Sequence, residues 1–145
     1  MQNTITDQVI KQGSSTRLNS DRNNCSVLAL AATTGKSYDE AYRIAENMWL
    51  RQRKKGVRMN TLVDYFTNTL GANKVDTKKV YHTKYNNKDV VCKMTLSTFS
   101  KQYPKGRYFV LISGHALAIN DGEILDHASL VSKNKRIIKH AWQIK

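Results

Sequence analysis

The sequence has few of the residues that hold small secreted or metal-binding domains together. Its 145 residues include two cysteines, too few for a disulfide framework, and they contain neither a CxxC nor an HExxH motif. We therefore expect no metal centre and no other cofactor.

Long apolar segments are also absent. The longest wholly apolar run is Val27–Ala32, whereas a helix that crosses a bilayer needs about 20 such residues. The opening MQNTITDQVIKQ offers no apolar signal core. We expect a cytoplasmic protein that neither inserts into a membrane nor is secreted through a signal peptide.

Acidic residues are scarce, and the charge is uneven. The chain has 24 Lys and Arg against 11 Asp and Glu, a formal net charge of +13. The segment 51–58 contains no acid and carries the cations Arg51, Arg53, Lys54, Lys55 and Arg58. Such a surface attracts nucleic acid or acidic proteins. The alternative is a solvated basic face without a partner.

The length fits one domain, 1–145, because two independent cores would each be small. Residues 1–22 are rich in Asn, Ser, Thr and Gln, and their apolar residues are too sparse to build a packed layer. We interpret this segment as a polar lead-in with at most one edge strand.

Three helices are predicted in the first half of the chain. An apolar segment begins at Cys25 and stops at Gly35, where a left-handed C-cap fits. Ser37 and Glu40 have the spacing of a capping box, and apolar residues follow at helical intervals. The predicted helices are 25–34, 37–49 and 59–70.

The second half favours antiparallel strands. Two strands flank an Asn-Asn turn at 86–87, and a short helix at 96–103 ends before Pro104. A buried strand is predicted at 107–113 and a last strand at 136–145. Because helices come first and antiparallel strands follow, the sequence predicts an α+β domain.

The segment HALAINDGEILDHA carries the strongest hairpin signal. Asp121 and Gly122 between two apolar-rich runs are typical of a type I′ turn, which needs positive φ at both central residues. Counting back along the ladder places His115 opposite Ala128. Asp126 then lies diagonally from His115 on the same face, within reach of a long side chain.

Cys25 has an unusual position at the first turn of a buried helix. The unpaired N–H groups and the helix dipole there favour the thiolate. A thiolate nucleophile needs a general base, and the base needs a group that fixes its tautomer. The candidate catalytic residues are therefore Cys25, His115 and Asp126.

Three segments of the chain together carry a family resemblance. The segments RNNCSVLALAATTGKSYDEAYRIA, GVRMNTLVDYF and GRYFVLISGHALAINDGEILD, within residues 22–127, resemble the small papain-like cysteine peptidase-like proteins of bacteriophages. The resemblance implies a papain-like fold, in which N-terminal helices carrying the cysteine pack on a C-terminal antiparallel sheet. It implies Cys25 as nucleophile, His115 as general base and Asp126 as its orienting acid, in a phage-encoded protein of the host cytoplasm.

The sequence departs from the papain pattern at two points. That pattern has a glutamine six residues before the nucleophile, where its amide stabilises the oxyanion, but this chain has the shorter Asn19. The backbone N–H of Cys25, with Asn23 or Asn24, is the alternative donor. The third catalytic residue is usually an asparagine on a separate strand, whereas Asp126 belongs to the hairpin itself.

Two functions fit these residues. One is a cysteine-dependent hydrolase, of the peptidase, isopeptidase or amidase type, that acts on a peptide or protein of the host. The other is a basic binding module on the same scaffold, which sequesters nucleic acid or an acidic host protein and whose triad is vestigial. Structural roles stay open too, with Cys25 as a small core hydrophobe, His115 as a satisfied histidine and Asp126 as a turn acid.

Overall fold

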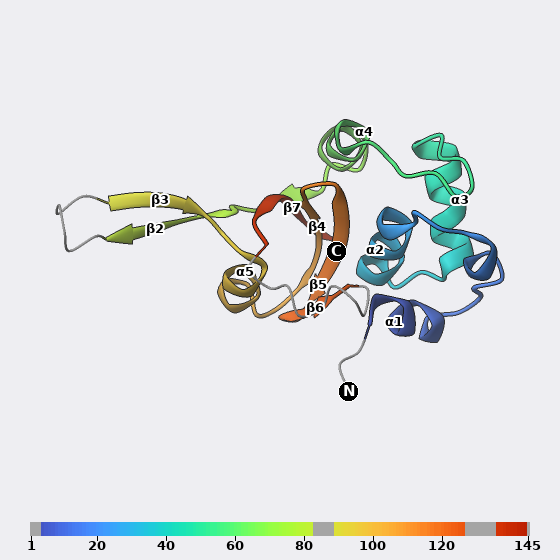
Figure 1. The fold of residues 1–145 in the computed structure, drawn as a ribbon, viewed down its shortest axis with the longest axis horizontal. Coiled ribbons are helices and arrows are strands. Elements are labelled where there is room, and N and C mark those ends of the chain that lie inside the picture. Colours follow the sequence, from blue (N-terminus) through green and yellow to red (C-terminus); the bar gives the residue numbers. More distant parts are fainter. Residues whose placement is uncertain (1–3, 83–88, 127–135, 145) are drawn as a thin grey trace.

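The computed structural model of the chain, drawn in Figure 1, describes residues 4–82, 89–126 and 136–144. The α-helices are Ile5–Lys11 (α1), Cys25–Thr34 (α2), Tyr38–Met48 (α3), Met59–Asp64 (α4) and Leu96–Gln102 (α5). The strands are Asn73–Lys74 (β1), Lys78–His82 (β2), Asp89–Lys93 (β3), Arg107–Ile112 (β4), His115–Asn120 (β5), Glu123–Leu125 (β6) and Ile138–Ile144 (β7). A 3-10 turn, Leu18–Ser20 (η1), and a π-helical turn, Tyr65–Thr69 (η2), complete the described elements. None of the described helices is long and apolar enough to cross a bilayer.

An antiparallel sheet of five strands forms the centre of the molecule, in the order β1-β7-β4-β5-β6. The strands β2 and β3 pair with each other in a separate two-stranded ribbon, which projects from the body at the left of Figure 1. The described part of the chain is therefore α+β, as the sequence predicts.

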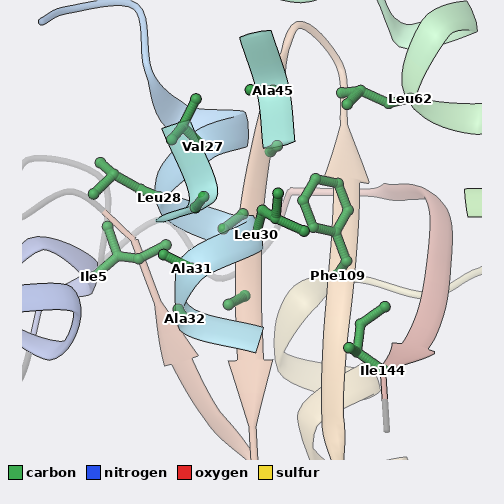
Figure 2. Packing of buried hydrophobic residues seen from close by; sticks show 14 of the residues in the cluster. Ile5, Val27, Leu28, Leu30, Ala31, Ala32, Ala45, Leu62, Phe109 and Ile144 are labelled. Carbon is green, nitrogen blue, oxygen red and sulfur yellow. The ribbon is translucent and has the colours of Figure 1, made fainter. Parts of the chain in front are cut away.

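The central sheet is buried on both faces. Side chains alternate along a strand, so Phe109 and Leu111 of β4 share a core with α1 to α4, while Val110 shares one with Phe99 of α5. Figure 2 shows Leu30 of α2 beside Phe109. Because α2 lies between the sheet and the other helices, nearly all its side chains are buried, which explains its uniformly apolar sequence.

The predicted ends of α2 and the predicted start of α3 are confirmed. α2 begins at Cys25 and ends before Gly35, whose φ of 75° lies in the left-handed region. Ser37 caps α3 by accepting the Glu40 N–H at 3.2 Å. The Glu40 carboxylate accepts the Ser37 hydroxyl at 3.3 Å, so only half of the predicted capping box forms.

The predicted helix at 59–70 changes its geometry midway. α4 is an ordinary α-helix, but beyond it the Leu70 N–H donates to the Tyr65 carbonyl, five residues earlier, at 2.7 Å. A π-helical turn of this kind rotates the residues that follow it about the helix axis. Leu70 is consequently exposed, whereas the apolar periodicity predicts it in the core.

The prediction of a polar lead-in with at most an edge strand is wrong at α1. This segment is a helix, whose start carries a full capping box between Thr4 and Asp7. Ile5 and Val9, about one turn apart, are buried in the same core as α2. Two apolar residues suffice because α2 already supplies the surface against which they pack.

The predicted hairpin between β5 and β6 is confirmed. Its turn residues Asp121 and Gly122 have φ values of 49° and 79°, as a type I′ turn requires. The strands β2 and β3 also pair as expected. The predicted Asn-Asn turn at 86–87 and the predicted ladder partner Ala128 lie outside the described residues.

Candidate active site

The N-terminus of α2 holds Cys25 as the first residue of the helix. The preceding residue, Asn24, does not cap the helix, because its side-chain amide donates to the Tyr38 hydroxyl at 3.0 Å. α2 therefore starts without a side-chain cap, and Cys25 lies at the positive end of the helix dipole.

A buried ion pair fixes the segment that leads to Cys25. The Arg51 guanidinium donates to both carboxylate oxygens of Asp21, each at 2.9 Å, and the Tyr38 hydroxyl donates to Asp21 as well. The Arg51 and Asp21 side chains are 1% and 0% exposed. Burial raises the pKa of Asp21, but these hydrogen bonds, that from Arg51 foremost, outweigh it and hold the pKa below its ordinary value.

The ion pair corrects the predicted basic surface. Arg51 is a buried structural residue and offers no charge to an acidic partner. The backbone N–H of Lys54 joins the same network, and the Lys54 side chain is half-buried. Arg53, Lys55 and Arg58 are exposed. Of the predicted cluster, these three residues alone present an exposed positive charge.

The β5–β6 hairpin brings His115 and Asp126 together. His115 is the first residue of β5, and Asp126 directly follows β6. His115 Nε2 and Asp126 Oδ1 are 2.6 Å apart, and Asp126 is only 1% exposed. The diagonal placement predicted from the ladder is thus a direct hydrogen bond.

Arg136 is a member of the site that sequence reasoning missed. Its guanidinium donates to the second carboxylate oxygen of Asp126 at 2.7 Å. The Arg136 carbonyl accepts the Leu96 N–H of α5, and the Asp126 carbonyl accepts the Ile5 N–H of α1, both at 3.0 Å. No spacing in the sequence links Arg136 to Asp126, so only the fold reveals the pair.

Cys25 and His115 line the same pocket, and each shifts the pKa of the other, in opposite directions. Burial raises the pKa of the thiol. A hydrogen bond with His115 and others from the N–H groups of Ala116 and Ser26 outweigh that effect, so the thiol pKa lies below 9.0. Burial lowers the pKa of His115, but hydrogen bonds with Asp126 and Cys25 raise it to about 9. The site therefore favours the thiolate of Cys25 and the imidazolium of His115, because each charged form stabilises the other.

A pocket of about 120 Å³ opens beside this pair, between the start of α2, α4 and the start of β5. Cys25 and His115 both line it, and Met59 and Leu62 contribute apolar walls. Cys25 is half-buried. Ser26 also lines the pocket, and its buried hydroxyl has no hydrogen-bond partner among the described residues.

The asparagines predicted as oxyanion donors do not line this pocket. The Asn24 amide is bound to Tyr38. The Asn23 amide donates to the Lys54 carbonyl at 3.1 Å. Asn19 is exposed on the η1 turn. The amides of Asn23 and Asn24 are thus bound to other groups, and none of the three asparagines is among the residues that line the pocket.

The second cysteine lies outside the candidate site. Cys92 is exposed on β3 of the projecting ribbon. Over the ranges 4–82, 89–126 and 136–144, no three His, Cys, Asp or Glu side chains converge as a metal site would require.

No protein-family model, no curated protein and no solved structure matches the chain. Its function is therefore inferred from the geometry and electrostatics of the site.

Proposed function

We propose that the chain is a cysteine-dependent hydrolase of the peptidase, isopeptidase or amidase type, with a papain-like arrangement of its nucleophile and base. The observation that carries this proposal is that Cys25 and His115 line one open pocket while His115 is hydrogen-bonded to the buried Asp126. A nucleophile, a base and a buried orienting acid in series are typical of acyl-transfer sites. The sequence resemblance points the same way, toward a protein of the host as substrate.

The reaction would proceed in two stages. The Cys25 thiolate adds to the substrate carbonyl carbon, and the His115 imidazolium gives its proton to the leaving amine as the C–N bond breaks. The thioester formed on Cys25 is then attacked by water, whose proton passes to the neutral His115. The C–S bond breaks, the carboxylic acid leaves, and the thiolate and imidazolium are restored.

Backbone groups would stabilise the oxyanion. The Cys25 N–H belongs to the first turn of α2, which has no side-chain cap, and it lies at the positive end of the helix dipole. The predicted asparagine amides are bound elsewhere. Asp126 would act as a positioning residue, because it contacts the His115 ring and not the sulfur.

Alkylation by iodoacetamide tests the first step. The exposed Cys92 serves as an internal reference in the same molecule, and mass spectrometry of the digested protein gives both rates at pH 6.5. We expect Cys25 to react at least about tenfold faster than Cys92, because the thiolate is the reactive form. The proposal is overturned if the two cysteines react equally and His115→Ala changes neither rate.

Turnover is tested separately with a library of internally quenched peptides. Wild-type protein should cleave a subset of the library, and Cys25→Ser should cleave none of it, because a neutral serine hydroxyl is a weak nucleophile beside the same base. Equal cleavage by both proteins would place the activity outside this site.

The projecting ribbon favours a second function. Lys78 of β2 lies directly opposite Lys93 of β3, and both side chains are exposed. Like charges that face each other across a strand pair are destabilising, and a bound polyanion would relieve that repulsion. The alternative is a nucleic-acid-binding module with a vestigial triad. Duplex binding that falls steeply with salt, survives Cys25→Ala and is lost in Lys78→Glu would favour it.

A further inference from the structure

A second and larger hollow, of about 510 Å³, lies where the end of β3, the end of β4 and the start of β7 contribute its lining. We call it the basic groove. Its lining residues are Lys93, Ile112, Ser113, Arg136, Ile137 and Lys139. The lining thus combines cations, one hydroxyl and two apolar side chains, and no acidic residue is among its described members.

Besides burial, the positive charges of three lysines in this part of the molecule all act on the pKa of one nearby residue, His140. Burial lowers the pKa of His140 on β7, and the charges of Lys74, Lys139 and Lys93 lower it further. Lys93 and Lys139 both line the groove, and their positive charges attract an anion to it. Lys93 and Lys139 are exposed, so their ammonium groups can reach a ligand in the groove.

The basic groove and the catalytic pocket meet at the turn between β4 and β5. Leu111 of the pocket and Ile112 of the groove lie on opposite faces of the sheet, so a substrate would occupy both by passing around the end of the sheet at this turn. Ser113 lines the groove and the next residue, Gly114, lines the pocket, and the Cα atoms of neighbouring residues are only about 3.8 Å apart. The pocket, at about 120 Å³, has room for a small group at the scissile carbonyl. A longer substrate must continue outside it.

We propose that the basic groove is a substrate subsite that holds an acidic stretch of polypeptide while an adjoining carbonyl group reaches Cys25. This inference rests on the proposed hydrolase function and names its substrate class. Lys93 and Lys139 would pair with Asp or Glu carboxylates, the Ser113 hydroxyl would donate to one of them, and Ile137, which is 54% exposed, would pack against their methylene groups. A polypeptide fits better than a nucleic acid, because the adjoining thiolate attacks acyl carbonyl groups and a nucleic-acid backbone has none.

A binding experiment tests the groove without the nucleophile. Full-length Cys25→Ala protein is titrated into a fluorescein-labelled peptide that carries four glutamates, and into its glutamine counterpart, with anisotropy as the readout. We expect the acidic peptide to bind at least about tenfold more tightly, with an affinity that falls as ionic strength rises. Lys93→Glu and Lys139→Glu should each weaken binding at least about threefold.

Arg43→Glu is the matched control. It makes the same change of charge on an exposed position of α3, at the opposite end of the molecule from the ribbon in Figure 1. We expect it to leave binding within about twofold. Equal binding of the two peptides, or an equal loss in Arg43→Glu and Lys139→Glu, would overturn the proposal, because general charge attraction would then explain the result.

Two further outcomes distinguish the acidic-peptide subsite from a nucleic-acid site and from the hydrolase proposal. If an oligonucleotide of twelve deoxythymidines binds in a manner that depends on Lys93 and the acidic peptide does not bind, the groove is a nucleic-acid site and the inference is wrong. If the acidic peptide binds through Lys93 and Lys139 but iodoacetamide finds Cys25 unreactive, the hydrolase proposal fails and the acidic-peptide site stands.

Discussion

At the scale of single residues, His115 couples two interactions that depend on each other. Its Nε2 is bound to Asp126 at 2.6 Å, which leaves Nδ1 as the ring nitrogen for the Cys25 thiol. Arg136 binds the other oxygen of Asp126, so the buried carboxylate is compensated from both sides. If the Asp126 carboxylate lost Arg136, its hydrogen bond to the His115 ring would be weaker, because the buried charge would be left uncompensated.

The coupling predicts how Cys25 responds to loss of the imidazole. In His115→Ala the thiol keeps its burial, which raises the pKa, and loses the hydrogen bond that lowers it most. The pH midpoint of iodoacetamide alkylation should therefore rise from below 9.0 in the wild type to about 9.0 or above. Alkylation rates measured from pH 5 to pH 10 check this.

His140→Ala is the control for that measurement, because His140 lies on β7 and does not line the catalytic pocket. Its midpoint should equal that of the wild type. An unchanged midpoint in His115→Ala would contradict the assignment of His115 as the base.

The Asp21–Arg51 pair supports a prediction about stability. Arg51→Ala leaves the Asp21 carboxylate buried without its bidentate partner, and loss of one member of a buried pair costs about 3 to 5 kcal/mol. Arg53→Ala, two residues away at an exposed position, should change the free energy of unfolding by less than about 0.5 kcal/mol. Urea denaturation of both variants checks this. Similar losses in the two would mean that the ion pair does not hold the loop before Cys25.

At the scale of elements, the sequence predicts those whose signals are local. The limits of α2 follow from its apolar run and from Gly35, and the β5–β6 hairpin follows from Asp121 and Gly122. The helix α1 could not be predicted in this way, because a seven-residue helix with two buried side chains is stabilised by the surface it meets. The π-helical turn after α4 could not be predicted either, because an apolar spacing of 3.6 residues assumes a regular α-helix.

The docking of α1 gives a prediction with its control in the same helix. Val9 is fully buried, and Ile10 is 50% exposed. Val9→Ala should cost about 2 kcal/mol of unfolding free energy, because it removes buried methyl groups and leaves a cavity. Ile10→Ala should cost less than about 1 kcal/mol. Urea denaturation checks both, and equal costs would show that α1 is not docked on α2.

At the scale of the whole molecule, the candidate site joins segments that are far apart in the chain. The sequence predicts Cys25 at a helix start and Asp126 beside His115, because a helix start and a hairpin register are local features. That Cys25 meets His115 is predicted only by the papain-like resemblance. It could not place Arg136, because that contact depends on how β7 and α5 pack against the hairpin. It also could not exclude Asn24 as an oxyanion donor, because its partner Tyr38 belongs to the next helix.

The site also makes the free energy of unfolding depend on pH, because the pKa values of His115 and Cys25 shift in opposite directions. The pKa of His115 is raised from 6.5 to about 9, so its stabilisation is fully present below pH 6.5 and is lost as the pH rises through 9. The pKa of Cys25 is lowered from 9.0, so its stabilisation is fully present above pH 9.0 and is lost as the pH falls through the folded-state value. Where these two pH ranges overlap, below pH 9, the two contributions change in opposite directions.

Removal of the thiol should expose the contribution of the imidazole. In Cys25→Ala, His115 loses the contributions of Cys25 to its raised pKa but keeps those of Asp126, so this variant still becomes less stable as the pH rises. Relative to the wild type, Cys25→Ala should lose more unfolding free energy between pH 6.5 and pH 9, measured by urea denaturation at both values. The double variant Cys25→Ala/His115→Gln should lose this extra dependence, because neither group then titrates. If Cys25→Ala follows the wild type across this range, the two residues do not share a proton in the folded protein, and the hydrolase mechanism loses its ion pair.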